Sequence, residues 1–122
     1  MKILILEDNV WINKSFKFVF KRDDVSYFKS VEDLIASDFD INSVDMIITD
    51  NHMGEMDGLS WLMSVHQVGY KHIPAILFSS DFEKVKLCES LDNVQGCNKD
   101  FDELQRLIML IFSEVVEEFS AL

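Results

Sequence analysis

Residues that interrupt regular structure are scarce in this chain, which has one proline and four glycines among 122 residues. Without a linker, low-complexity tract or internal repeat, the sequence predicts one domain over residues 1–122. No apolar run approaches the roughly 20 residues that a transmembrane helix needs. The apolar start, MKILILEDN, is also too short for a signal peptide. We therefore expect a cytoplasmic protein without a membrane partner.

Positive charge is also scarce, because 11 Lys and Arg stand against 22 Asp and Glu, for a net charge of -11. Nucleic acid phosphates repel a chain this acidic, so we expect no nucleic acid partner. A metal cation or a basic protein surface is the more fitting partner. Cysteine supplies no metal motif, because Cys88 and Cys97 lack a C-x-x-C spacing, and we expect two reduced thiols.

Apolar residues are plentiful, at 48% with 11% aromatic, and this composition is typical of a packed globule. Short apolar runs alternate with segments of helical periodicity, which indicates a parallel sheet covered on both faces. The expected strands are 2–6, 25–28, 45–49, 73–78 and 94–98. The expected helices are 10–21, one that starts at residue 30, 58–68, one that ends near residue 91, and 101–119.

This alternation predicts an α/β protein with a (βα)5 doubly wound sheet of five parallel strands. Right-handed crossovers favour the flavodoxin-like strand order 2-1-3-4-5. Ligands of such sheets bind beyond the carboxyl ends of the strands, near the switch point between the first and third strands. The residues that follow the strands are therefore the candidates for chemistry.

Polar residues follow four of the five expected strands. They are Glu7 and Asp8 after the first, Asp50 after the third, Ser79 after the fourth and Lys99 after the fifth. Taken singly, each of these residues is more often a turn, a cap or a solvated charge. Their joint placement at one edge of a sheet is what predicts a functional site.

The chemistry of these residues fits phosphoryl transfer. Three carboxylates at one edge repel one another, and Mg²⁺ relieves this repulsion with the oxygen ligands that it prefers. Asp50 can act as a carboxylate nucleophile toward phosphorus. Phosphoryl transfer needs mainly positioning and charge neutralisation, which Mg²⁺ and Lys99 supply. The Ser79 hydroxyl can donate a hydrogen bond to a phosphoryl oxygen.

The strings ILILEDN, DMIITDNHMGEMDG and IPAILFSS, together with Lys99, resemble the receiver domains of response regulators from bacterial two-component systems. The resemblance covers the whole chain and implies that Asp50 is the phosphoacceptor. It implies that Asp8 binds Mg²⁺ directly, that Glu7 binds it largely through water, and that His52 supplies its backbone carbonyl.

The resemblance further implies that Ser79 is the switch hydroxyl and that Lys99 pairs with the phosphoryl group. Side chains at His52 and Asp81 occupy positions that tune the phosphorylation kinetics in this family. A sensor histidine kinase or a phosphotransfer protein would supply the phosphoryl group. The chain would not be an enzyme, because it would catalyse only its own phosphorylation and dephosphorylation.

Three positions depart from the family pattern. Gly96 replaces an aromatic residue that transmits the signal in most receivers. Asp100 replaces a proline after Lys99, so we expect a trans Lys99–Asp100 bond, some displacement of Lys99, and Asp100 as a cap of the last helix with Glu103. Gly54 replaces a proline in the loop after Asp50, which predicts a looser loop.

Further expectations concern packing and caps. Periodicity places Trp11 and Trp61 on buried helix faces. Ser30 and Ser80 begin capping-box patterns, and Gly69 suits a left-handed helix cap. The acids at positions 114, 117 and 118 are expected to form a solvated face.

Three functions remain open at this point. The first is a stand-alone receiver whose output is a protein contact through the fourth helix, the fifth strand and the last helix; a piece of a longer regulator would look the same. The second is a receiver-like binding module that works without phosphorylation. The third is a phosphatase of the aspartyl-phosphate type. Such enzymes tend to have a D-x-D pattern at the nucleophile, and here His52 stands in place of the second Asp, which opposes this function. The cognate kinase, the output partner and any homodimer stay open.

Overall fold

The computed structural model describes the backbone of residues 1–120 and the side chains of residues 1–113. Five parallel strands form one sheet in the order β2-β1-β3-β4-β5, which confirms the predicted fold. The strands are β1 (Lys2–Leu6), β2 (Asp24–Phe28), β3 (Met46–Thr49), β4 (Ala75–Phe78) and β5 (Val94–Cys97). The helices are α1 (Val10–Val19), α2 (Val31–Ala36), α3 (Gly58–Gln67), α4 (Phe82–Leu87) and α5 (Phe101–Ser120), with 3-10 turns η1 (Ile41–Ser43) and η2 (Cys88–Ser90).

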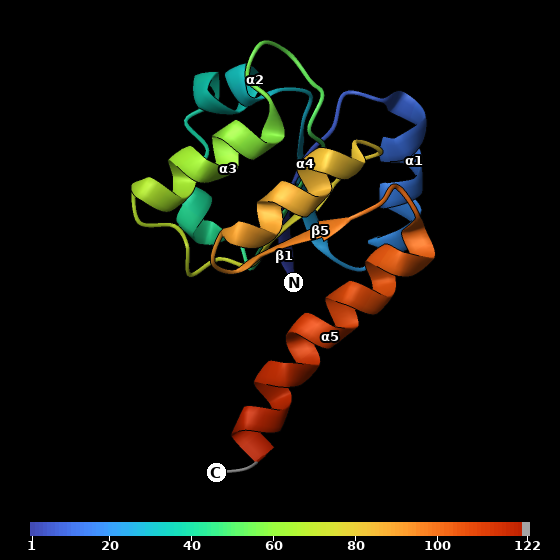
Figure 1. Cartoon of the computed structure of the whole chain (residues 1–122). Helices are drawn as coiled ribbons and strands as arrows, with labels where there is room; N and C mark the ends of the chain where they lie inside the picture. The colour runs from blue at the N-terminus through green and yellow to red at the C-terminus, as the bar shows by residue number, and fades with distance from the viewer. Residues whose placement is uncertain (121–122) are drawn as a thin grey trace.

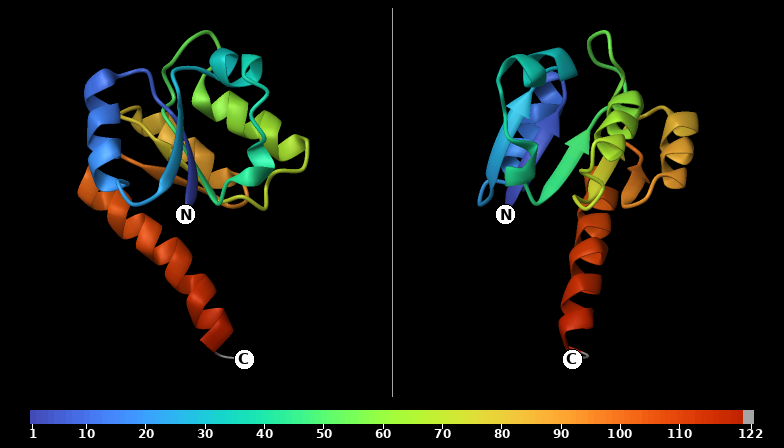
Figure 2. Two further views of the ribbon diagram at one scale, coloured as in Figure 1. Left: turned by 180° about the vertical axis from the view of Figure 1, so that it is seen from behind. Right: turned by 90° about the vertical axis from the view of Figure 1, so that its left-hand side faces the viewer.

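Helices lie on both faces of the sheet (Figures 1 and 2). On one face α1 and α5 pack against Ile3 and Ile5 of β1 and their neighbours. On the other face α2 and α3 pack against Leu4 and Leu6. The three inner strands are buried on both sides, as expected for parallel strands under crossover helices. Their carboxyl ends consequently meet at a single edge.

The last helix, α5, packs against the sheet near its start and then extends beyond it (Figure 1). Leu104 is fully buried, and Leu107, Ile108, Ile111 and Phe112 pack against the core. The acids expected to form a solvated face at positions 114, 117 and 118 lie outside the described side chains. Within the described residues, no helix is both long enough and apolar enough to cross a membrane.

Two of the expected helix ends agree with the structure and one is wrong. Ser30 caps α2 by accepting a hydrogen bond from the backbone N–H of Asp33. Gly69 follows α3 with a φ of 101°, a conformation that glycine adopts without steric cost. The predicted cap at Ser80 is wrong, because Asp81 caps α4 and accepts from the N–H of Lys84.

The two tryptophans differ in burial. Trp61 is buried in the core, as predicted, with 5% of its surface exposed. The prediction for Trp11 is wrong, because 73% of its surface is exposed and the Lys14 ammonium lies 4.5 Å from its ring centroid. Trp11 belongs to the first turn of α1, where the apolar stripe is wider than the part of the helix that contacts the sheet.

Gly96 allows α4 to lie close to β5. A Cβ atom at position 96 would collide with the carbonyl oxygen of Val85 and would lie 2.6 Å from its Cγ1 atom. Both atoms belong to Val85 in the middle of α4. The carbonyl oxygen is part of the helix backbone, so it cannot move aside unless the whole helix shifts. The helix backbone thus takes the space beside position 96 in which a side chain would stand.

Asp100 caps the last helix, as predicted. Its Oδ1 atom accepts hydrogen bonds from the N–H groups of Asp102 and Glu103, at 2.9 and 3.3 Å. The described chain has no cis peptide bond, so the Lys99–Asp100 bond is trans as expected. An acidic cap at a helix start also interacts favourably with the helix dipole.

We predict that Gly96→Ala destabilises the fold by roughly 1–3 kcal/mol, because the added methyl group forces α4 away from β5. Gln95→Ala is the control, since it truncates an exposed neighbour on the same strand. Urea unfolding of both variants measures the difference. Equal stability of the two variants would show that α4 can move away from β5 without a cost in stability.

Candidate functional site

The candidate site lies at the carboxyl edge of the sheet, where the polar residues predicted from the strand ends follow their strands. Glu7 and Asp8 follow β1, Asp50 follows β3, and Ser79 follows β4. Register holds these positions together, because Leu6 pairs with Thr49 and Thr49 pairs with Leu77. Apolar strand residues thus bury the backbone up to the edge, and the polar side chains begin where the strands end.

Lys99 joins two of the three carboxylates. Its Nζ atom lies 3.1 Å from Glu7 Oε1 and 3.1 Å from Asp50 Oδ2. These ion pairs connect the ends of β1, β3 and β5. The expected displacement of Lys99 is therefore wrong: even with Asp100 in place of proline, the ammonium reaches both acids.

Glu7, Asp8 and Asp50 form a cluster in which one oxygen from each carboxylate lies within 4.8 Å of the others. Glu7 and Asp50 are buried, at 3% and 5% exposure, whereas Asp8 is exposed. Three carboxylates against the single ammonium of Lys99 leave the cluster with excess negative charge. Oxygen donors in this arrangement fit a hard dication such as Mg²⁺.

Burial and ion pairing together shift the pKa values of Glu7 and Lys99. Burial, and next the neighbouring charge of Asp50, raises the pKa of Glu7 to about 7 despite its pairing with Lys99. Burial acts to lower the pKa of the Lys99 ammonium, but its pairing with Glu7 and Asp50 outweighs burial and raises it. Lys99 is therefore charged at neutral pH, while Glu7 titrates near neutrality.

Asn51 fixes the loop that begins at Asp50. The N–H of Asn51 donates to Asp50 Oδ1 at 2.7 Å, which orients the carboxylate whose other oxygen contacts Lys99. The buried Asn51 side chain accepts from the N–H of Leu59, and its carbonyl accepts from the N–H of Gly58. The start of α3 is thereby tied to the residue that orients the Asp50 carboxylate. This role of Asn51 was not predicted from the sequence, because a single Asn in a loop resembles an ordinary turn residue.

Ser79 is fully buried at the end of β4. Its N–H donates to the carbonyl of Cys97, and its Oγ atom accepts a hydrogen bond from the N–H of Asp81 at 3.1 Å. A hydroxyl that accepts one bond keeps its own proton for another acceptor. Ser79 therefore has a donor available next to the strand that carries Asp50.

His52 and Asp81 connect the loops after β3 and β4. The Nε2 atom of His52 lies 3.0 Å from Asp81 Oδ2. The N–H of Lys84 and the contact with His52 lower the pKa of Asp81, so its carboxylate is ionised at neutral pH. The imidazole is thus engaged with Asp81. A metal contact from the His52 carbonyl stays a prediction.

The loop after Asp50 is fastened by Glu32 of α2, against the expectation of a looser loop. Glu32 Oε1 accepts hydrogen bonds from the N–H groups of Glu55 and Met56, at 3.1 and 3.0 Å. Gly54 has a φ of 58°, and a Cβ there would lie 2.6 Å from Glu32 Oε2. Glycine is what allows the carboxylate so close to the loop.

A mostly polar hollow of about 410 Å³ opens beside the acidic cluster. Asp8, His52 and Gly54 are among the residues that line it. Of the three acids in the cluster, Asp8 lines this hollow and is exposed to solvent there. A metal with bound waters and a small phosphorylated donor group could enter here.

We predict that Glu7→Gln stabilises the metal-free protein at pH 8 by roughly 1–3 kcal/mol and changes it little at pH 5. The folded-state pKa of Glu7, about 7, exceeds its ordinary value of 4.5. The stability that protonated Glu7 contributes to the folded state is therefore fully present below about pH 4.5 and is lost as the pH rises through 7. Urea unfolding in EDTA measures both values, with the exposed Glu89→Gln as control. A benefit of Glu7→Gln that is the same at both pH values would contradict this assignment.

We predict that Glu32→Ala speeds amide hydrogen exchange severalfold at Glu55 and Met56, because their N–H groups lose their acceptor. Asp33→Ala removes the same charge from the next residue of α2, and its side chain has no contact with the loop among the described interactions. NMR-detected exchange resolves the individual amides. Unchanged protection in Glu32→Ala would mean that other contacts hold the loop.

No protein-family profile and no curated protein sequence matches the chain. Solved structures do match it. The receiver domain of Francisella response regulator 1452 has 19% identity and a TM-score of 0.75, over 93% of this chain and 98% of that one. A putative response regulator from Chloroflexus aurantiacus has 18% identity and a TM-score of 0.77, over 92% and 97%.

A third similar structure is the response regulator protein TrrA from Thermotoga maritima in complex with Mg²⁺–BeF. It has 18% identity and a TM-score of 0.72, and the match covers 88% of this chain and 95% of that one. All three matches extend over nearly the whole length of both chains. The chain therefore has the fold of response-regulator receiver domains, as its strand-end motifs had predicted.

Proposed function

We propose that this protein is a phosphorylation-dependent signalling switch in which Asp50 accepts a phosphoryl group from a sensor histidine kinase or a phosphotransfer protein. The observation that carries the proposal is that the buried Asp50 carboxylate pairs with Lys99 and also belongs to the acidic cluster with Glu7 and Asp8. A structural ion pair would need one acid for the one lysine. Three acids at an edge that is open to solvent favour a site for a cation and a phosphoryl group.

The transfer reaction follows from the contacts of Asp50. An oxygen of the carboxylate attacks phosphorus, the bond from phosphorus to the donor imidazole nitrogen breaks, and the departing imidazole takes up a proton. Lys99 neutralises charge on the carboxylate side, and the N–H of Asn51 holds the carboxylate in orientation. The Ser79 hydroxyl donates to a phosphoryl oxygen.

Glu7, Asp8 and Asp50, with the carbonyl of His52, are the residues that would hold Mg²⁺. When bound, Mg²⁺ would supply neutralisation of the phosphoryl oxygens. The chain would thus promote only its own phosphorylation and hydrolysis, so we do not class it as an enzyme. A cytoplasmic location follows from this role, since histidine kinases present their phosphorylated histidine there.

The signal would pass through Ser79 and Asp81. Ser79 Oγ accepts from the N–H of Asp81, and the Asp81 side chain both caps α4 and contacts His52. Movement of the hydroxyl toward a phosphoryl group would therefore disturb the cap of α4. This route needs no aromatic residue at position 96. The output would be a protein contact through α4, β5 and α5, where Phe82 and Leu87 are exposed.

A binding module that works without phosphorylation is the second candidate. The observation that favours it is the close packing of α4 on Gly96, which fills the space an aromatic switch would use. The intact acidic cluster and the position of Lys99 oppose it.

Phosphorylation by a small phosphodonor such as acetyl phosphate separates the two candidates. We predict a mass gain of one phosphoryl group that requires Mg²⁺ and is lost in Asp50→Asn. Asp92→Asn, an exposed acid beyond the other end of β5, should leave the gain intact. Intact-protein mass spectrometry with Mg²⁺ or EDTA measures this. A folded wild type that gains no mass with Mg²⁺ would favour the binding module.

A further inference from the structure

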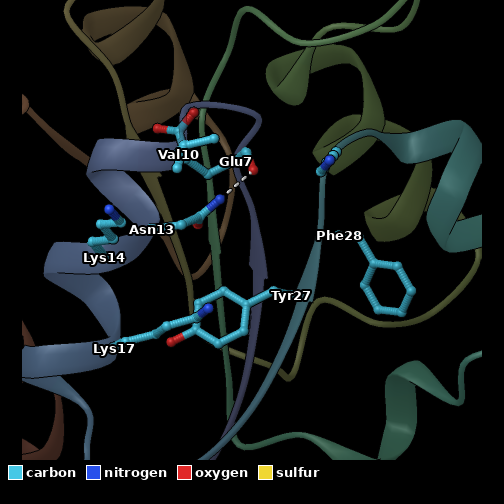
Figure 3. Close-up of a pocket in the computed structure, with 8 residues that line it drawn as sticks. Glu7, Val10, Asn13, Lys14, Lys17, Tyr27 and Phe28 are labelled. Atoms are coloured by element: carbon cyan, nitrogen blue, oxygen red, sulfur yellow. Dashed lines mark hydrogen bonds between the residues drawn. The ribbon is translucent and has the colours of Figure 1, made fainter.

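A second cavity lies between α1 and the edge strand β2 and adjoins the acidic edge at Glu7. It has a volume of about 280 Å³ (Figure 3). This is close to the lower end of the roughly 300–1,000 Å³ that small-molecule sites span, so it would hold only a small ligand. Val10 and Tyr27 supply apolar surface, and the ring of Phe28 points away from it (Figure 3).

Three lysines surround this cavity: Lys14 and Lys17 of α1, and Lys29 after β2. None of them has a carboxylate within ion-pair distance among the described side chains. Lys14 and Lys17 instead lie over aromatic rings, at 4.5 Å from the centroid of Trp11 and 5.7 Å from that of Tyr27. In a chain with twice as many acids as bases, three lysines without acids around one cavity form a local positive region.

Asn13 adds a second polar feature. Its Nδ2 atom donates to the Glu7 carbonyl at 2.8 Å, as Figure 3 shows, and this bond fixes the orientation of the amide. The Oδ1 atom is buried and has no hydrogen-bond partner. A buried acceptor without a donor costs free energy. Because the Oδ1 atom has almost no accessible surface, a ligand hydroxyl or amino group would reach it only with a small movement of the Asn13 side chain, which lines the cavity.

Glu7 is the one acid in the lining, but its charge is directed elsewhere. Its Oε1 atom lies 3.1 Å from the Lys99 ammonium, and its Oε2 atom accepts from the N–H of Asn9. Toward Asn13 it presents its carbonyl. An anion in the cavity would therefore meet three ammonium groups and no unpaired carboxylate of the lining.

We propose that this cavity binds a small organic phosphate that carries an apolar or aromatic body and a hydroxyl or amino donor. The lysines would hold the phosphate, because a compact ammonium group suits a doubly charged phosphate. Val10 and Tyr27 would contact the body of the ligand, and Asn13 Oδ1 would accept from its donor. Such binding would not require phosphorylation of Asp50.

Adenosine monophosphate is a suitable probe, since it has a phosphate, an aromatic base and hydroxyl groups. Isothermal titration in EDTA should give one site per chain, with weaker binding of inorganic phosphate and of adenosine. Lys14→Gln, Lys17→Gln and Lys29→Gln should each weaken binding about tenfold. Lys21→Gln is the matched control, because Lys21 lies over Phe18 and outside the lining.

NMR titration with the same probe locates the site. Shifts should centre on the Asn13 side-chain amide and on Tyr27. Shifts centred on Ser79 and Lys99 would place the phosphate at the acidic edge and overturn the proposal. It would also be overturned by an absence of binding, by equal binding of adenosine, or by lysine variants that impair only phosphotransfer from a kinase, since the lysines would then serve a protein contact. None of these outcomes tests whether Asp50 accepts phosphate.

Discussion

The ammonium of Lys99, held between the carboxylates of Glu7 and Asp50, connects the fold to its chemistry. Parallel strands bring their carboxyl ends to one edge whether or not the residues there attract each other, and in this chain three of those residues are acids. Lys99 offsets part of their repulsion and joins three strand ends through two contacts of 3.1 Å. It leaves excess negative charge beside a solvent-open hollow. That imbalance is unfavourable for a purely structural cluster, and it is what a site for a dication requires.

The sheet and the residues at its edge could be predicted from the sequence because both follow from local patterns. Apolar runs define the strands, and the first polar residue after a run marks the edge of a parallel sheet. The choice of helix cap and the burial of single side chains were harder to predict, because they depend on competing local signals. Ser80 and Asp81 can both cap a helix, and the path of the chain after β4 selects Asp81. Trp11 has the periodicity of a buried residue, but only part of that apolar stripe meets the sheet. Replacing proline with Asp100 did not displace Lys99, because the ion pairs fix the ammonium regardless of the bond that follows.

The contacts that organise the loops could not be predicted, because they join residues far apart in the sequence. Glu32 reaches the N–H groups of Glu55 and Met56, and His52 reaches Asp81 across 29 positions. None of these residues belongs to a motif that requires the other. Gly54 replaces a proline of the family pattern, and from this replacement the sequence predicted a looser loop after Asp50. Its actual effect is a close approach of the Glu32 carboxylate, which restrains the loop instead.

Gly96 shows how a departure from a family pattern can be tied to one neighbouring element. The backbone of α4 occupies the space beside it, so an aromatic side chain and the observed position of α4 exclude each other. Under the proposed function, a signal from the acidic edge would therefore have to reach α4 by another path. Ser79 contacts the backbone of Asp81, and Asp81 is the cap of that helix. In this arrangement the Ser79 hydroxyl and the start of α4 are one hydrogen bond apart. The close packing of α4 on Gly96 leaves no room for an aromatic side chain. In the same arrangement, the residue that caps α4 is hydrogen-bonded to Ser79.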